Sequence, residues 1–257
     1  MPGFDVKVPS SARVWNYWVG GKDNFAADRE AGEQILRAMP TLRAIAHMSR
    51  RFLIDVVDDL AVERGITQFL DIGTGLPTAD NTHDVAQRAV PSARIVYADH
   101  DPVVLTHARA LLTSTPEGKT DYIQADVRDP EVILSAAQRT LDFSQPVAVI
   151  LIFVMHFVPD AEDPYDVVRR LMEPLAPGSY LVMGHAASDI AADFMAAGAD
   201  AYNDRVSAQI TPRDHAGVSR FFDGLELIDP GVAPMAEWLG ASDDRGLQAY
   251  GGVGRKP

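Results

Sequence analysis

The sequence contains no cysteine and no long apolar run, and it has fewer basic than acidic residues. Without cysteine the chain has neither disulfides nor thiolate metal sites, which agrees with a reducing cytoplasm. Its 36 acidic residues outnumber its 23 Lys and Arg, which argues against a nucleic-acid partner, because phosphate backbones are bound by basic side chains. No apolar run approaches the roughly 18 residues of a membrane helix, and no signal-peptide core is visible. We therefore expect a cytoplasmic enzyme or binding domain that binds neither nucleic acid nor membrane.

The spacing of apolar residues along the chain changes at Gly65. Before it, apolar residues recur at helical spacing, so residues 1–64 are expected to be almost wholly helical. After it, short apolar segments alternate with helical patterns, which is typical of a parallel sheet covered on both faces. We predict an α/β fold with a helical N-terminal cap over 1–64 and a sheet-containing core over 65–257. The expected strands are 66–75, 93–101, 120–129, 146–158 and 178–187, with further strand segments at 225–232 and 246–255.

The first predicted strand ends in the glycine-rich turn DIGTGLPT. Open parallel sheets bind ligands at the carboxyl ends of their strands, which is where Gly73, Thr74 and Gly75 stand. Glycine lets a ligand approach the backbone closely because it has no Cβ. Asp71 is expected to orient the amides of this turn or an amino group of the ligand. Taken alone the turn is a weak signal, since similar turns serve many nucleotides.

Carboxylates end the next two predicted strands. Asp99 ends the second strand, where it can accept hydrogen bonds from two ribose hydroxyls. Asp126 ends the third, where it can accept from an adenine amino group while Val127 packs near the ring; a turn cap is the alternative. His100 either borders the adenosine or helps to cap the following helix. A glycine turn and two acids at successive strand ends together predict an adenosine site, to which we also assign Phe153.

The turn disfavours a pyrophosphate. The dinucleotide fingerprint G-x-G-x-x-G needs glycine where this chain has Thr78, and the turn contains no Lys or Arg. An NAD-linked oxidoreductase is therefore the less favoured alternative. A molecule with adenosine but no phosphate fits better, and S-adenosylmethionine is such a cofactor.

Several segments resemble those of a known family. SSARVWNYWVGGKDNF, FLDIGTGLPTADNTHDVAQ, VYADHDPVVL, HFVPDAEDP and FFDGLELIDPGV…YGGVGR are similar to segments of the actinobacterial S-adenosyl methyltransferases, formerly a domain of unknown function. The likeness spans nearly the whole chain. It implies a class I methyltransferase core, a Rossmann-like seven-stranded sheet with the last strand antiparallel. Pro77 replaces the third glycine of the wider class, as is normal for the narrower family, and the likeness identifies no acceptor.

Three polar residues are candidates for catalysis or for contact with the methyl acceptor. His156 closes the apolar fourth strand, where an imidazole can take a proton from an O–H or N–H nucleophile or merely orient it. The alternative is a histidine hydrogen-bonded beneath a loop. His185 occupies a comparable place after the fifth strand. Tyr202, on a helix near the end of the chain, can extend over the opening of the same ligand site. No metal is expected, because the histidines lack ligand spacing and the acids of 160–163 are explained by the helix start that follows.

An aromatic segment precedes the core. Ser10 or Ser11 can cap a helix that Gly20-Gly21 ends, with Trp15 and Trp18 on one face. Such a helix suits a lid with a glycine hinge, which excludes water and holds the acceptor in line with the methyl–sulfur bond. We expect the tryptophans to anchor the helix and the polar residues to face the pocket. The candidates for ligand contact are Arg13, Tyr17, Asp23 and Asn24.

The predicted activity is methyl transfer from S-adenosylmethionine to N, O or a nucleophilic ring carbon of a small molecule. An aromatic or heterocyclic natural product of secondary metabolism fits the acidic charge balance and the helical lid. Two alternatives remain, a protein or peptide methyltransferase with a long open groove, and a regulatory module that binds the cofactor without turnover. The sequence determines neither the acceptor atom, nor the need for a general base, nor the oligomeric state.

Overall fold

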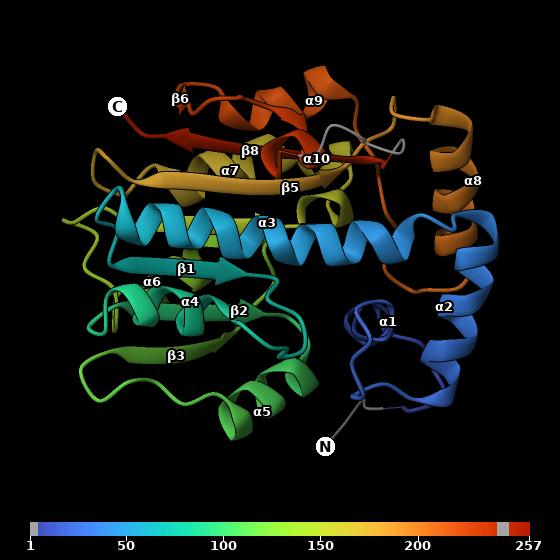
Figure 1. The fold of residues 1–257 in the computed structure, drawn as a ribbon, viewed down its shortest axis with the longest axis horizontal. Helices are drawn as coiled ribbons and strands as arrows, with labels where there is room; N and C mark the ends of the chain where they lie inside the picture. The colour runs from blue at the N-terminus through green and yellow to red at the C-terminus, as the bar shows by residue number, and fades with distance from the viewer. Residues whose placement is uncertain (1–4, 241–246) are drawn as a thin grey trace.

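The computed structural model describes residues 5–240 and 247–257, and in that part of the chain one mixed sheet of eight strands forms the centre (Figure 1). Its order is β3-β2-β1-β4-β5-β8-β6, and β7 pairs with β8 off this path. The first five strands are parallel, and β8 runs antiparallel to its neighbours. The predicted class I architecture is confirmed, and the additional strand is the two-residue β7. The strands are β1 Gln68–Ile72, β2 Arg94–Asp99, β3 Lys119–Gln124, β4 Ala148–Ile152, β5 Tyr180–Ala186, β6 Glu226–Leu227, β7 Ala233–Pro234 and β8 Ala249–Arg255.

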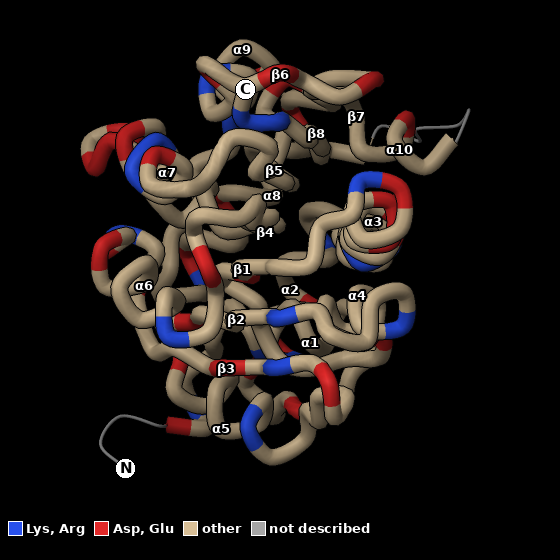
Figure 2. The backbone as a smooth tube through the Cα atoms, turned by 90° about the vertical axis from the view of Figure 1, so that its left-hand side faces the viewer, with Lys and Arg blue, Asp and Glu red and all other residues tan. Residues whose placement is uncertain are grey.

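Helices cover both faces of this sheet. They are α1 Ser11–Trp18, α2 Ala26–Ala38, α3 Leu42–Val62, α4 Thr82–Ala89, α5 Pro102–Leu111, α6 Pro130–Ala137, α7 Pro164–Met172, α8 Ala192–Asn203, α9 His215–Ser219 and α10 Met235–Trp238, with 3-10 turns η1 Met155–Phe157, η2 Asp160–Glu162 and η3 Arg220–Phe222. Figure 2 shows α3, α4 and α10 on one face and α6 and α7 on the other. Among the described residues, no helix combines the length and apolarity that crossing a membrane requires.

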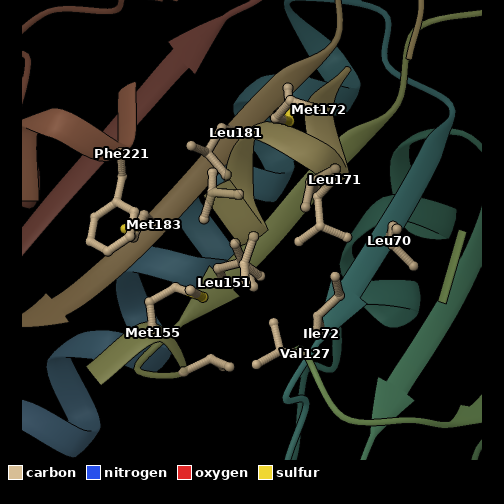
Figure 3. Close-up of a cluster of buried hydrophobic side chains, with 14 of the residues drawn as sticks. Leu70, Ile72, Val127, Leu151, Met155, Leu171, Met172, Leu181, Met183 and Phe221 are labelled. Carbon is tan, nitrogen blue, oxygen red and sulfur yellow. The ribbon is translucent and has the colours of Figure 1, made fainter. Parts of the chain in front are cut away.

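The central strands are apolar because both of their faces are buried. On β1, Leu70 and Ile72 point into the core beneath α6 and α7, whereas Phe69 belongs to the core beneath α3. Figure 3 shows the first of these cores, in which side chains of β1, β4 and β5 meet Leu171 of α7 and Phe221 of η3. Strands buried on both faces are typical of parallel sheets.

The N-terminal helices occupy two places. Figure 1 shows α1 and α2 beyond the carboxyl ends of β1 and β2, together with α8. In contrast, α3 lies along the sheet, where Phe52 and Val57 share one core with Phe69 and Ile95. Thus α1 and α2 lie over the strand ends while most of α3 packs along the sheet, and the boundary that we placed after residue 64 stays a prediction.

The strands near the two candidate histidines differ from the sequence prediction. β4 ends at Ile152 rather than at residue 158, because Phe153 adopts a left-handed backbone (φ 56°) that leaves the strand. His156 therefore stands on the 3-10 turn η1 after the strand. His185 lies within β5, not after it.

Candidate functional site

A cavity lies at the carboxyl ends of the parallel strands, bordered by α1, α3 and α8. Trp15, Phe153 and Phe157 line it with aromatic rings, and the centroids of the first two rings are 5.1 Å apart. A second hollow adjoins it toward β3. The predicted residues Asp71, Gly73, Thr74, Gly75, Asp99, His100, Phe153, His156 and Tyr202 line the first, and Gly73, Asp99, His100, Asp126 and Val127 line the second.

The glycine turn after β1 tolerates no side chain at Gly73. Its backbone is left-handed (φ 70°), and a Cβ there would lie 2.2 Å from Cγ2 of Val154. Gly75 is also left-handed (φ 66°), and its N–H donates to Oδ2 of Asp99 at 3.0 Å. The turn after β1 is thus tied to the end of β2, so that bare backbone faces both hollows.

The acids of the site differ in burial. Asp99 is 5% exposed, and burial raises its pKa, although N–H groups of Gly75 and Asp101 donate to it. Burial likewise raises the pKa of Asp71 to about 6, while the Thr82 hydroxyl donates to its carboxylate at 2.5 Å. These contacts fix both carboxylates in one orientation beside the glycine turn.

Two other predicted residues are more open to solvent. Asp126 accepts from the backbone N–H of Arg128 at 3.0 Å and pairs with its guanidinium at 3.1 Å. It therefore caps its own turn while it lines the second hollow. His100 is exposed, with Nδ1 3.4 Å from a carboxylate oxygen of Asp99.

The two histidines have different surroundings. His156 is buried, and its Nδ1 has no hydrogen-bond partner among the described residues. Burial holds its pKa well below the usual range, and the nearby His185 and Arg213 add to the effect, so the imidazole is neutral near pH 7. His185 donates from Nδ1 to the carbonyl of Ala186 at 2.9 Å and accepts at Nε2 from Arg213 at 3.0 Å. With burial lowering its pKa to about 3, His185 is a neutral, doubly bonded core residue behind the cavity.

Tyr202 of α8 reaches the cavity between two aromatic neighbours. Its ring lies 6.4 Å from Trp18 and 6.3 Å from Phe157, centroid to centroid. Burial raises its pKa far above the usual value, and a hydrogen bond with Ser11 opposes that rise. Tyr202 thus connects α8 to the first turn of α1 and remains protonated.

The polar residues predicted for ligand contact lie outside the cavity lining. Arg13 forms a buried ion pair with Asp28 (Nε to Oδ2, 2.8 Å), which ties α1 to α2. The Tyr17 hydroxyl bonds to Glu33 and accepts from Arg43. Asp23 and Asn24 follow the glycine pair; the backbone N–H of Asp23 and the amide of Asn24 both donate to Oδ1 of Asn16. These residues hold the N-terminal segment in place.

The lining residues that the sequence analysis missed include Asn16 and Arg50. Asn16 lies between Trp15 and Tyr17, both of which the sequence analysis singled out. Arg50 left a clear signal, because it continues the apolar stripe of α3 formed by Ala46, Leu53 and Val57. A guanidinium at that spacing indicates a charge turned toward the interior rather than toward solvent. Among the described residues that line the cavity, Arg50 is the one Lys or Arg.

Comparison with known proteins identifies the family. Residues 2–257 match the family model described as S-adenosyl methyltransferase. A DUF574-family protein from Streptomyces avermitilis MA-4680 has a crystal structure with a TM-score of 0.94 at 42% identity, over 98% of this chain and 99% of that one. A Thermobifida fusca YX protein, provisionally assigned as a methyltransferase, has a TM-score of 0.90 at 39% identity, over 99% and 97% of the two chains.

More distant structures share the fold alone. The plantazolicin methyltransferase BpumL, solved with S-adenosylhomocysteine and a substrate analogue, has a TM-score of 0.52 at 10% identity, over 96% of both chains. No curated protein matches. The family match over the whole chain and the two close structures agree with the glycine turn and the acids beside it. The chain therefore belongs to the S-adenosyl methyltransferase family and is a methyltransferase whose cofactor is S-adenosylmethionine.

Proposed function

We propose that this methyltransferase acts on N, O or a nucleophilic ring carbon of a small planar acceptor, such as an aromatic or heterocyclic natural product. The observation that carries the proposal is the aromatic surround of His156, whose ring centroid is 4.2 Å from that of Phe157 and 5.7 Å from that of Phe153. Phe153, His156 and Tyr202 are each at most 9% exposed. A buried site lined by aromatic rings suits a small flat molecule better than a peptide chain, which needs a groove.

The residues present fit the cofactor. The bare glycine backbone and the buried carboxylate of Asp99 suit the ribose, while Asp126 and Val127 of the adjoining hollow suit the adenine. In the adenine assignment, the Asp126 carboxylate would bind the base while it also caps its own turn through the N–H of Arg128. When bound, S-adenosylmethionine supplies an electrophilic methyl group on a sulfonium. The chain has to orient the acceptor, exclude water and accept the proton that an O–H or N–H acceptor loses.

Arg50 and Asp71 suit the amino-acid end of the cofactor. Nη2 of Arg50 donates to the carbonyls of Ala79 and Asp80, at 3.0 and 2.8 Å, and Nε and Nη1 have no hydrogen-bond partner among the described residues. Burial raises the pKa of Asp71, and the positive charge of the neighbouring Arg50 opposes that rise. A guanidinium beside a carboxylate matches the α-carboxylate and α-ammonium of methionine.

Arg50→Gln is expected to weaken binding of S-adenosylhomocysteine by roughly tenfold to a hundredfold, the worth of a charge-assisted hydrogen bond. Binding of 5′-methylthioadenosine, which lacks the amino-acid end, should change less than about twofold. Titration calorimetry with both ligands measures the contrast. Arg51→Gln is the matched control, because Arg51 is exposed on the same helix and pairs with Asp55. Equal losses for both ligands would show that Arg50 supports the fold instead.

The acceptor class is tested by label transfer. The purified protein is incubated with methyl-labelled S-adenosylmethionine and, separately, with the small-molecule and the protein fractions of the host extract. Label in an aromatic small molecule is the expected result. Label in protein would favour the peptide alternative. Binding of S-adenosylhomocysteine without label in either fraction would favour a regulatory module.

A further inference from the structure

The side-chain amide of Asn16 is held in one orientation. Asn16 is 2% exposed, and its Oδ1 accepts from the backbone N–H of Asp23 at 3.1 Å and from Nδ2 of Asn24 at 2.9 Å. Asn24 also donates to the carbonyl of Gly21 at 2.9 Å. With two donors on the oxygen, the amide cannot be flipped without losing both bonds, so Nδ2 is the atom left over.

The glycine pair after α1 completes this hold. A Cβ on Gly21 would lie 2.3 Å from Nδ2 of Asn16 and 2.5 Å from its Oδ1. Gly20 has a left-handed backbone (φ 80°), which lets the chain turn back over the end of the helix. The expected hinge therefore also has a local purpose, because the turn clamps the Asn16 amide between bare backbone and the following loop.

Two residues that line the same cavity each carry an unsatisfied nitrogen. In the part of the chain that the structure describes, Nδ2 of Asn16 and Nδ1 of His156 are the buried side-chain polar atoms without a hydrogen-bond partner. Both residues line the cavity beneath α1. A buried polar group without a partner costs about 1–3 kcal/mol, so two in one cavity indicate that a ligand supplies the missing partners.

The chemistry of the two nitrogens limits that ligand. Nδ2 of an asparagine only donates, so it requires a lone pair, whereas Nδ1 of a neutral imidazole donates or accepts according to tautomer. Trp15 and Phe153 form an aromatic wall next to Asn16 and His156. Arg50, the cation in the lining, lies beside Asp71. We have assigned it to the amino-acid end of the cofactor, so it is not needed to bind the acceptor.

We propose that Asn16 is a specificity-determining residue, which donates from Nδ2 to a carbonyl oxygen or an unprotonated ring nitrogen of a planar, uncharged methyl acceptor. His156 then pairs through Nδ1 with a second polar group of the same molecule. This inference rests on the proposed function and adds to it the hydrogen-bonding pattern of the acceptor. If Nδ2 instead served the carboxylate of the cofactor, cofactor affinity would depend on it, and that difference can be measured.

The test uses two bicyclic probes of equal shape, 6-hydroxyquinoline, which has a ring nitrogen, and 2-naphthol, which has a carbon in its place. Both are titrated into protein saturated with S-adenosylhomocysteine. Asn16→Asp keeps the oxygen that Asp23 and Asn24 require but replaces the donor with an acceptor. Asn16→Leu removes the donor at similar volume and is the second variant, and thermal unfolding of each shows whether it folds. Asn203→Asp is the matched control, because Asn203 is not a lining residue and its amide is already paired with the backbone of Ile210.

The wild type and Asn203→Asp should bind the quinoline about fivefold to tenfold more tightly than the naphthol, the worth of one hydrogen bond. Both Asn16 variants should lose this preference and keep their affinity for S-adenosylhomocysteine. The inference is overturned if the wild type shows no preference or binds neither probe, or if the variants retain it. A variant with weakened S-adenosylhomocysteine binding would reassign Nδ2 to the cofactor. Failure of the wild type to bind S-adenosylhomocysteine at all would instead contradict the cofactor site on which the proposed function depends.

Discussion

Asp99→Ala is expected to lower the affinity for S-adenosylhomocysteine by at least about a hundredfold. In the proposed site its carboxylate accepts from two ribose hydroxyls, and charge-assisted hydrogen bonds contribute about 1.5–3 kcal/mol each. The same carboxylate also holds Gly75 through Oδ2 at 3.0 Å, so its removal releases the glycine turn as well. Both losses act on the same ligand, which makes this the largest expected effect on binding.

Titration calorimetry separates the two contributions of Asp99. Asp99→Asn retains an oxygen for the N–H of Gly75 and loses the negative charge, so it should bind more tightly than Asp99→Ala but more weakly than the wild type. Asp101→Asn is the control, because Asp101 lies two residues away and caps α5 through the N–H of Val103. Unchanged affinity in Asp99→Asn would mean that the ribose is bound elsewhere.

The sheet and the strand-end residues could be predicted because their signals are local. Runs such as the one around Leu70 are apolar since both faces of the strand are buried. Parallel strands bring their carboxyl ends to one edge of the sheet. The proximity of Gly73, Asp99 and Asp126 could therefore be predicted without knowing any side-chain contact. The end of β4 escaped prediction because Phe153 leaves the strand through a left-handed backbone that its residue type does not favour.

The orientation of polar side chains could not be predicted, because it depends on partners distant in the sequence. Arg13 turns away from the cavity since Asp28, on another helix, provides its buried ion pair. His185 loses both of its nitrogens to hydrogen bonds, one of them from Arg213. Asn16 faces the cavity because residues after the glycine pair hold its oxygen. In each case the sequence gives a polar residue near the site but not the contact that decides its role.

His156→Gln is expected to lower kcat for an O–H or N–H acceptor by roughly a hundredfold or more, the usual contribution of a general base. Burial holds the pKa of the imidazole well below the usual range, so it is unprotonated at neutral pH and has a lone pair with which to accept a proton. Its folded-state pKa lies below the free value of about 6.5, so kcat should stay flat as the pH falls through 6.5 and decline only in more acidic solution. The affinity for S-adenosylhomocysteine should change less than about threefold.

The measurement is the initial rate of S-adenosylhomocysteine formation across pH, with the acceptor found by label transfer. His47→Gln is the control, because His47 is exposed on α3, away from the cavity lining. Added imidazole should restore part of the activity of His156→Gly, since a small base can enter the space that the side chain vacates. A His156→Gln rate within about threefold of the wild type, with the same acid limb, would contradict proton transfer to this residue. Because Nδ1 of His156 lacks any partner among the described residues, such a result would leave it the role of orienting the acceptor by a hydrogen bond.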